Sequence, residues 1–238
     1  MRASLSVSTQ EKHPHIPARH IMDRIVLGGS DGAIECVAMA AALNGAGVAF
    51  GTVLIAGLAF ALAGGASMFF SSYLARRSEI GALKMDIARE KMEIESEPEE
   101  ERAELEALLK EEGYEQREVD VIMGRLVKNK ELWLREQLRH ELRVNVEDLE
   151  TDPLLGPGLA GAAFFGTAIL AIAAYTLALE RVETLLLSVV LSLLALFSLS
   201  SRLFTPTHFS AKAGLESAAV GGVAAGALYS IGLLIGSL

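Results

Sequence analysis

Eight glutamates fall within one short segment of this chain, Arg89–Leu105. Glu90 with Glu93 and Glu101 with Glu104 form two pairs, and the three-residue spacing puts both members of a pair on one face of a helix. Carboxylates held close together repel one another, and a divalent cation with oxygen ligands relieves that repulsion. The segment therefore predicts a site for divalent metal ions, with a solvated acidic helix as the alternative.

Two further carboxylates interrupt the apolar segment 25–44. Asp31 and Glu35 are four residues apart, which places them on one face of a helix. Ionised carboxylates in hydrocarbon are costly, so these two must face a cavity or a partner; the alternative is a structural carboxyl group neutralised by a proton or a hydrogen bond. Met68, in the next apolar segment, offers a soft thioether to these hard oxygens, a mixture that suits Fe²⁺ and other borderline metals; simple packing is the alternative.

The composition divides the chain into two kinds of segment. With 51% hydrophobic residues and a mean hydropathy of +0.38, the chain is too apolar for an ordinary soluble domain, yet 21% of its residues are charged. Residues 75–150 hold 14 Lys and Arg against 22 Asp and Glu, which is almost all of the net charge of −9. The apolar runs that can cross a bilayer of about 30 Å are 25–44, 48–74, 154–179, 184–201 and 213–238.

The expected fold class is thus an all-α membrane protein with five transmembrane helices and a cytoplasmic three-helix acidic domain between spans two and three. Basic residues flank the first two spans: Arg19 and Arg24 precede the first, and Arg76, Arg77 and Lys84 follow the second. The positive-inside rule therefore places the start of the first span and the end of the second in the cytoplasm. With five spans, the C-terminus then lies outside. The expected organisation is a flexible tail, two spans, the acidic metal-binding domain and three spans, over residues 1–20, 21–74, 75–152 and 153–238.

The acidic domain is predicted to contain three helices, roughly 76–96, 98–112 and 115–146. The first continues the second span out of the membrane, and Gly113 separates the second from the third. His140 in the third helix is a candidate metal ligand, with an exposed histidine as the alternative.

Small residues recur at every fourth position in three of the spans. This pattern predicts close helix contacts rather than ligand sites. The residues are Gly57, Ala61 and Gly65, then Gly158, Ala162 and Gly166, then Gly222 and Gly226.

Other chemistries have no motif in this sequence. There is no phosphate-binding loop, nucleophile elbow or zinc-protease helix, so we predict no enzyme and no cofactor. The single cysteine, Cys36, excludes an intramolecular disulfide and a cysteine-based metal site. The absence of a Glu-x-x-His pair argues against a ferritin-like di-iron bundle, and the negative charge disfavours nucleic acid.

The chain resembles the vacuolar iron transporters and their prokaryotic relatives. The likeness lies in VLGGSDGAIE (26–35), in GTVLIAGLAFALAGGASMFFSSYLARRSE (51–79) and in the glutamates that follow, and it covers residue 24 to the C-terminus. The resemblance implies a five-span homodimer with a cytoplasmic metal-binding helical domain, exchanging Fe²⁺ or Mn²⁺ for protons.

Residue by residue, the resemblance implies both a cytoplasmic and a membrane site. The family's membrane aspartate and methionine fall on Asp31 and Met68. Its E-x-x-E, seven residues, E-x-x-E pattern and its later E-L glutamate fall on Glu90, Glu93, Glu101, Glu104 and Glu141.

The chain departs from the family pattern at several positions. Gln137 and Leu138 stand where relatives often carry a methionine pair, so the soft part of the cytoplasmic site is either missing or moved, with Met92 and His140 as the candidates. Phe60 stands where some relatives have a glutamate, and Glu35 occupies a position that is usually uncharged.

We therefore predict a transporter of Fe²⁺, with Mn²⁺ as a further candidate, that exports metal from the cytoplasm in exchange for protons. The metal is substrate, bound by the glutamates and His140. Asp31 carries metal and proton in alternation, Glu35 assists it, and Met68 is a soft ligand from the facing helix. The expected partners are a second copy of the chain, protons and the lipid bilayer, in the inner membrane of a prokaryote or the vacuolar membrane of a eukaryote. The alternatives are a membrane-anchored metal buffer or sensor and a structural membrane scaffold.

Overall fold

The computed structural model describes residues 18–141, 152–177, 179–201 and 209–238. These residues form helices and no strands, as the sequence predicts for the fold class. The predicted tail up to residue 17 and the predicted helix end at 142–146 lie outside the described residues.

Five helices in the described part of the chain are long and apolar enough to cross a membrane, which confirms the predicted number of spans. The third of them ends in a short 3₁₀ helix, η2 (Ala173–Thr176). The five are α1 (Ala18–Gly45), α2 (Phe50–Ser96), α6 (Leu155–Ile172), α7 (Arg181–Ser200) and α8 (Ala211–Gly236).

Helix α1 is the centre of this bundle and packs most extensively against α6 and α8. Glycines make the close approach possible: a Cβ at Gly28 would collide with the carbonyl oxygen of Ala160 in α6. A Cβ at Gly232 of α8 would likewise collide with the carbonyl oxygen of Ala42 in α1. Small residues thus let helix backbones touch where lipid offers no hydrophobic driving force for association.

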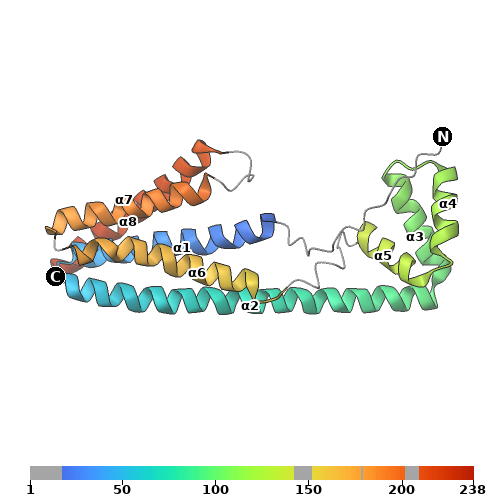
Figure 1. Cartoon of the computed structure of the whole chain (residues 1–238), viewed down its shortest axis with the longest axis horizontal. Coiled ribbons are helices and arrows are strands. Elements are labelled where there is room, and N and C mark those ends of the chain that lie inside the picture. Colours follow the sequence, from blue (N-terminus) through green and yellow to red (C-terminus); the bar gives the residue numbers. More distant parts are fainter. Residues whose placement is uncertain (1–17, 142–151, 178, 202–208) are drawn as a thin grey trace, which may run out of the picture.

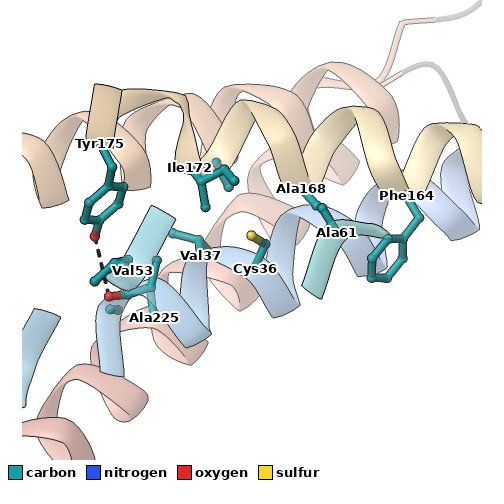
Figure 2. Packing of buried hydrophobic residues seen from close by; sticks show 12 residues of the cluster. Cys36, Val37, Val53, Ala61, Phe164, Ala168, Ile172, Tyr175 and Ala225 are labelled. Atoms are coloured by element: carbon teal, nitrogen blue, oxygen red, sulfur yellow. Dashed lines mark hydrogen bonds between the residues drawn. The ribbon is translucent and has the colours of Figure 1, made fainter. Parts of the chain in front are cut away.

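The core of the bundle is a buried apolar cluster between these helices. Cys36 and Val37 of α1 meet Ala168 and Ile172 of α6 in it (Figure 2). At one end the Tyr175 hydroxyl donates a hydrogen bond to the carbonyl oxygen of Ala40 over 3.5 Å, which ties η2 to α1.

The predicted small-residue contacts are confirmed for one helix, whereas most of the glycines predicted in the other two helices make no such contact within the described chain. Gly57, Ala61 and Gly65 are buried in α2, and a Cβ at Gly65 would lie 3.1 Å from the carbonyl oxygen of Gly161 in α6. Among the described residues, nothing lies within 4 Å of a Cβ built at any member of a second set, which faces away from the bundle. That set is Gly158, Gly166 and Gly226.

Helix α2 extends far beyond the membrane. Its 47 residues would measure about 70 Å at about 1.5 Å per residue, roughly twice the hydrocarbon thickness. The apolar part ends at Leu74 and charged residues begin at Arg76, so the second half projects out of the bundle (Figure 1). The prediction that the first acidic helix continues the second span is confirmed.

The acidic domain sits at the far end of α2 (Figure 1). Its other helices are α3 (Pro98–Glu111), α4 (Gln116–Leu126) and α5 (Lys130–His140). Helices α3 and α5 pack against the end of α2, and α4 packs against α3 and α5. Their shared core consists of Ile94, Leu105, Leu109, Val119, Met123, Leu126 and Trp133.

The predicted single helix over 115–146 is wrong, and the described residues of the domain form four helical segments rather than three. Asn129 is extended, with φ −136° and ψ 97°, and its side chain accepts hydrogen bonds from the backbone N–H groups of Glu131 and Leu132. This side-chain cap begins α5 and breaks the helix there. Pro98 in the first turn of α3 and Gly113, with φ +99°, act as the sequence predicts.

Candidate metal site

Three helices bring the acidic residues of the predicted site together. The end of α2 carries Glu90, α3 carries Glu101, and Glu141 follows directly after α5. The side chains of Glu90 and Glu101 are only 1% and 7% exposed. Carboxylates are rarely buried this deeply without a partner, so this part of the domain core is built around charge. We call Glu90, Glu93, Glu101, Glu104 and Glu141 the glutamate cluster.

A glutamine links two members of the glutamate cluster. The Nε2 of Gln137 donates hydrogen bonds to Glu101 Oε2 at 3.0 Å and to Glu141 Oε2 at 3.5 Å. Gln137 is fully buried, on the face of α5 that meets the cluster. Sequence reasoning did not count it among the site residues, although its position one helical turn before Glu141 is a signal that could have done so.

The cluster carries strong mutual repulsion. The pKa of Glu90 is raised to about 7, first by burial and then by the charges of Glu141, Glu101 and Glu93, against a lowering by Arg89. The pKa of Glu101 is also raised, first by burial and then by repulsion from other glutamates. A cation placed among these oxygens would remove the cost of their ionisation.

The remaining two glutamates lie at the rim. Glu93 is 38% exposed, and its Oε2 lies 3.6 Å from Nε of Arg89. Glu104 is exposed on α3 and acts on Glu101 through its charge. The cluster thus has a buried interior of Glu90 and Glu101, next to Gln137, and a solvent-accessible edge formed by Glu93 and Glu104.

The glutamates of the cluster lie close together but do not form a complete metal site in the described part of the chain. Among the described residues, no three His, Cys, Asp or Glu side chains are arranged to hold one metal ion. The carboxylates are near enough to repel one another, but their oxygens do not converge on one point. Their roles as ligands stay predictions.

His140 is engaged with other carboxylates. Its Nδ1 lies 2.8 Å from Glu112 Oε1, and its Nε2 lies 3.5 Å from Glu136 Oε2. Its side chain is only 12% exposed, so it is not the exposed histidine of the alternative interpretation. Within the described residues it also makes no hydrogen bond to the glutamate cluster. Its role as a metal ligand stays a prediction.

The predicted membrane residues lie on α1 and α2. Asp31 is half-buried and Glu35 is exposed on the surface of the single chain. Within the described residues neither carboxylate has a hydrogen bond or ion pair. Met68 is half-buried against the bundle core, and its Sδ accepts a hydrogen bond from the Ser72 hydroxyl at 3.8 Å.

Helix α6 stands between α1 and α2 near these residues. Phe164 contacts both Gly32 of α1 and Gly64 of α2. A direct meeting of Asp31 and Met68 in one protomer therefore has no support from the packing, and the role of Met68 as a ligand from the facing helix stays a prediction.

Comparison with known proteins gives one consistent family. The model of the VIT family matches residues 22–233. A vacuolar iron transporter 1 of Arabidopsis thaliana is 31% identical over 225 residues, which cover 93% of this chain and 88% of that protein. The vacuolar iron transporter 1 of Eucalyptus grandis is 31% identical over 224 residues, covering 93% and 89%. A vacuolar iron transporter of Toxoplasma gondii is 27% identical over 238 residues, covering 95% and 78%.

Proposed function

Because this chain belongs to the VIT family, we propose that it exports Fe²⁺ from the cytoplasm in exchange for protons, with Mn²⁺ as a second substrate. Membership implies metal transport, and the five apolar helices make the chain an integral membrane protein. The ion, the exchange for protons and the direction are the proposed part.

The observation that carries the proposal is a buried carboxylate, Glu90, on the same helix that forms a membrane span. Glu90 is 1% exposed, and its pKa is about 7, raised first by burial. At neutral pH it is therefore divided between its protonated and ionised forms, and an arriving divalent cation displaces the proton. Metal capture and proton release are in this way coupled at one side chain.

The membrane step is assigned to Asp31 and Glu35, with Met68 as the soft ligand. Exposed Glu35 and half-buried Asp31 lack a partner among the described residues, although an ionised carboxylate facing lipid is costly. A second copy of the chain covering this face of α1 would remove that cost and complete the ligand set, so the proposed unit is a homodimer.

The acidic domain is proposed to lie in the cytoplasm and the C-terminus outside, because Arg76 and Arg77 follow the second span directly. The relatives are named for the vacuole, which favours the vacuolar membrane in a eukaryote; nothing in the comparisons supports the prokaryotic inner membrane.

The test is transport by the purified protein in liposomes that contain a pH-sensitive dye. Fe²⁺ uptake with proton movement in the opposite direction is expected for the wild type. Asp31→Asn should abolish both while leaving metal binding by the acidic domain intact. Asp23→Asn, an exposed change on the same helix, is the matched control and should transport normally. Uptake without proton movement would reject the exchange.

The second candidate is a membrane-anchored metal buffer or sensor. It is favoured by one observation: the acidic domain has a hydrophobic core of its own, separate from the core of the membrane bundle. Such a domain can bind metal without any path through the bilayer. Wild-type protein that binds Fe²⁺ but gives no uptake in the same liposomes would establish this function instead.

A further inference from the structure

We propose that a groove between α1, α7 and α8 binds a phospholipid whose headgroup carries a primary amine, phosphatidylethanolamine, with its phosphate at Lys212 and its ammonium group at Glu216. This inference does not depend on the proposed function, because it concerns the lipid around the membrane bundle and not the transported ion. The groove is separate from the glutamate cluster and from Asp31, Glu35 and Met68.

The groove is a cavity of about 200 Å³ at the surface of the membrane bundle. Three spans form its walls, with the residues Ser30, Ile34, Leu196, Glu216, Ser217 and Val220. Val220 is 60% exposed, and Leu215 and Val223 on the same helix are exposed as well, so this side of α8 faces lipid. Half of the lining residues are aliphatic, as a groove for part of an acyl chain requires.

Two hydroxyl groups in the groove have no protein partner. Within the described residues, neither Ser30 nor Ser217 makes a hydrogen bond. Ser230, further along α8, instead donates to the carbonyl oxygen of Gly226 over 2.9 Å, the usual arrangement for a serine in a membrane helix. An unpaired hydroxyl group in hydrocarbon costs free energy, and the ester and phosphate oxygens of a phospholipid are acceptors that remove this cost.

Glu216 lines the groove and has a lysine beside it. The Nζ of Lys212 lies 3.8 Å from Glu216 Oε1, which is too far for a hydrogen bond, and the two side chains are 87% and 68% exposed. A lysine in the first turn opposes the helix dipole, and lysine before glutamate is the weaker order for such a pair. The pair therefore contributes little to the stability of α8, and both charged groups are accessible to a ligand.

The order of these groups along α8 matches the layers of a bilayer. Helices α1 and α8 both begin at the end of the bundle that faces the acidic domain (Figure 1). Val220 lies eight residues after Lys212, or about 12 Å at about 1.5 Å per residue. The interfacial layer on each side of the hydrocarbon is about 5 to 8 Å thick. The charged pair therefore lies at the level of the headgroups, Ser217 near the ester groups and Val220 beside the acyl chains.

The two opposite charges select the headgroup. The ammonium group of Lys212 donates to a phosphate, and the carboxylate of Glu216 accepts from a cationic donor. The primary ammonium group of phosphatidylethanolamine has three N–H donors, whereas the quaternary ammonium group of phosphatidylcholine has none. Phosphatidylglycerol has no positive charge, and Glu216 repels its net negative charge. The groove should therefore bind phosphatidylethanolamine most tightly of the three.

The test is native mass spectrometry of the full-length protein, purified in detergent and titrated with the three lipids, which have identical acyl chains. The wild type should bind phosphatidylethanolamine with the lowest apparent Kd. Glu216→Gln should remove its advantage over phosphatidylcholine, and Lys212→Gln should weaken all three lipids. Ser217→Ala should raise the apparent Kd of phosphatidylethanolamine about fivefold, the loss of one hydrogen bond. Ser230→Ala, with a hydroxyl group satisfied within its own helix, is the matched control and should bind like the wild type.

Three outcomes would overturn the inference. If the wild type binds phosphatidylethanolamine and phosphatidylcholine alike, or if the preference survives in Glu216→Gln, the charged pair does not recognise the headgroup. If Ser217→Ala and Ser230→Ala change lipid binding equally, the lipid does not lie in this groove. If Ser217→Cys, introduced together with Cys36→Ala, forms a disulfide between two copies of the chain, a second copy covers the groove in place of a lipid.

Discussion

Metal binding to the glutamate cluster should release protons in an amount that Glu90 sets. Its pKa is about 7, so it is about half protonated at pH 7. By the same relation it holds about 0.9 proton at pH 6 and about 0.1 at pH 8. Because a bound cation requires the ionised form, Glu90 should release these amounts when metal binds.

The affinity for metal should follow the same titration. The proton competes with the metal, so the apparent affinity should rise as the pH rises toward 7 and level off above it, where Glu90 is already ionised. Below pH 7 the proton on Glu90 should weaken binding by up to about tenfold per pH unit.

Calorimetry of the full-length protein with MnCl₂ measures this release directly. Titrations at one pH in two buffers with different ionisation enthalpies give the number of protons, and the series runs from pH 6 to 8. Glu90→Gln should lose the pH-dependent part of the release. Glu95→Gln, an exposed change of the same charge on the same helix, should keep it. A proton count that is constant from pH 6 to 8, or equal in wild type and Glu90→Gln, would refute the reasoning.

Four further predictions concern stability. The pKa of Glu90 is raised from an ordinary value of 4.5, so the folded protein binds more protons than the unfolded protein. The metal-free acidic domain should therefore lose stability as the pH rises from about 4.5 through 7. Thermal melting at a series of pH values measures this loss. Gly161→Ala should lower the melting temperature, because its Cβ would lie 2.7 Å from the carbonyl oxygen of Gly65, whereas Gly158→Ala, with nothing within 4 Å, should not. Arg181→Gln should cost about 2 kcal/mol in denaturant unfolding, since the guanidinium donates to three carbonyl oxygens of the α1–α2 turn and lies 5.4 Å from the Phe50 ring centre. Asn129→Ala should cost about 1 kcal/mol by removing the cap of α5, and Asn129→Asp should largely restore it.

Length and hydropathy were enough to predict the membrane helices, because both are properties of a continuous run of residues. Single strong backbone signals worked equally well: Pro98 begins α3, and Gly113 ends the next turn with a positive φ. The break before α5 was missed because Asn129 lies among polar and charged residues and has no glycine or proline beside it. A side-chain cap in such surroundings is a weak signal.

The contacts of the spans could not be predicted at the same level. A repeat of small residues identifies one face of a helix but not what that face meets, and α6 is apolar on all sides. Its close contact with α2 therefore runs through Gly161, while Gly158 and Gly166 face away. The glutamate spacing predicted which side chains of α2 and α3 share a face, but only the tertiary packing shows that Gln137 joins Glu101 to Glu141.

The geometry of α2 limits how tightly the cluster can hold its ion in the proposed transport. Glu90 and Met68 lie on one unbroken helix, 22 residues and about 33 Å apart at about 1.5 Å per residue. An ion at the cluster therefore cannot pass directly to the membrane ligands and must dissociate first. A site built only to bind would keep its carboxylates ionised, but burial keeps Glu90 partly protonated at neutral pH. The returning proton then helps to expel the metal, so the repulsion within the cluster serves release as much as capture.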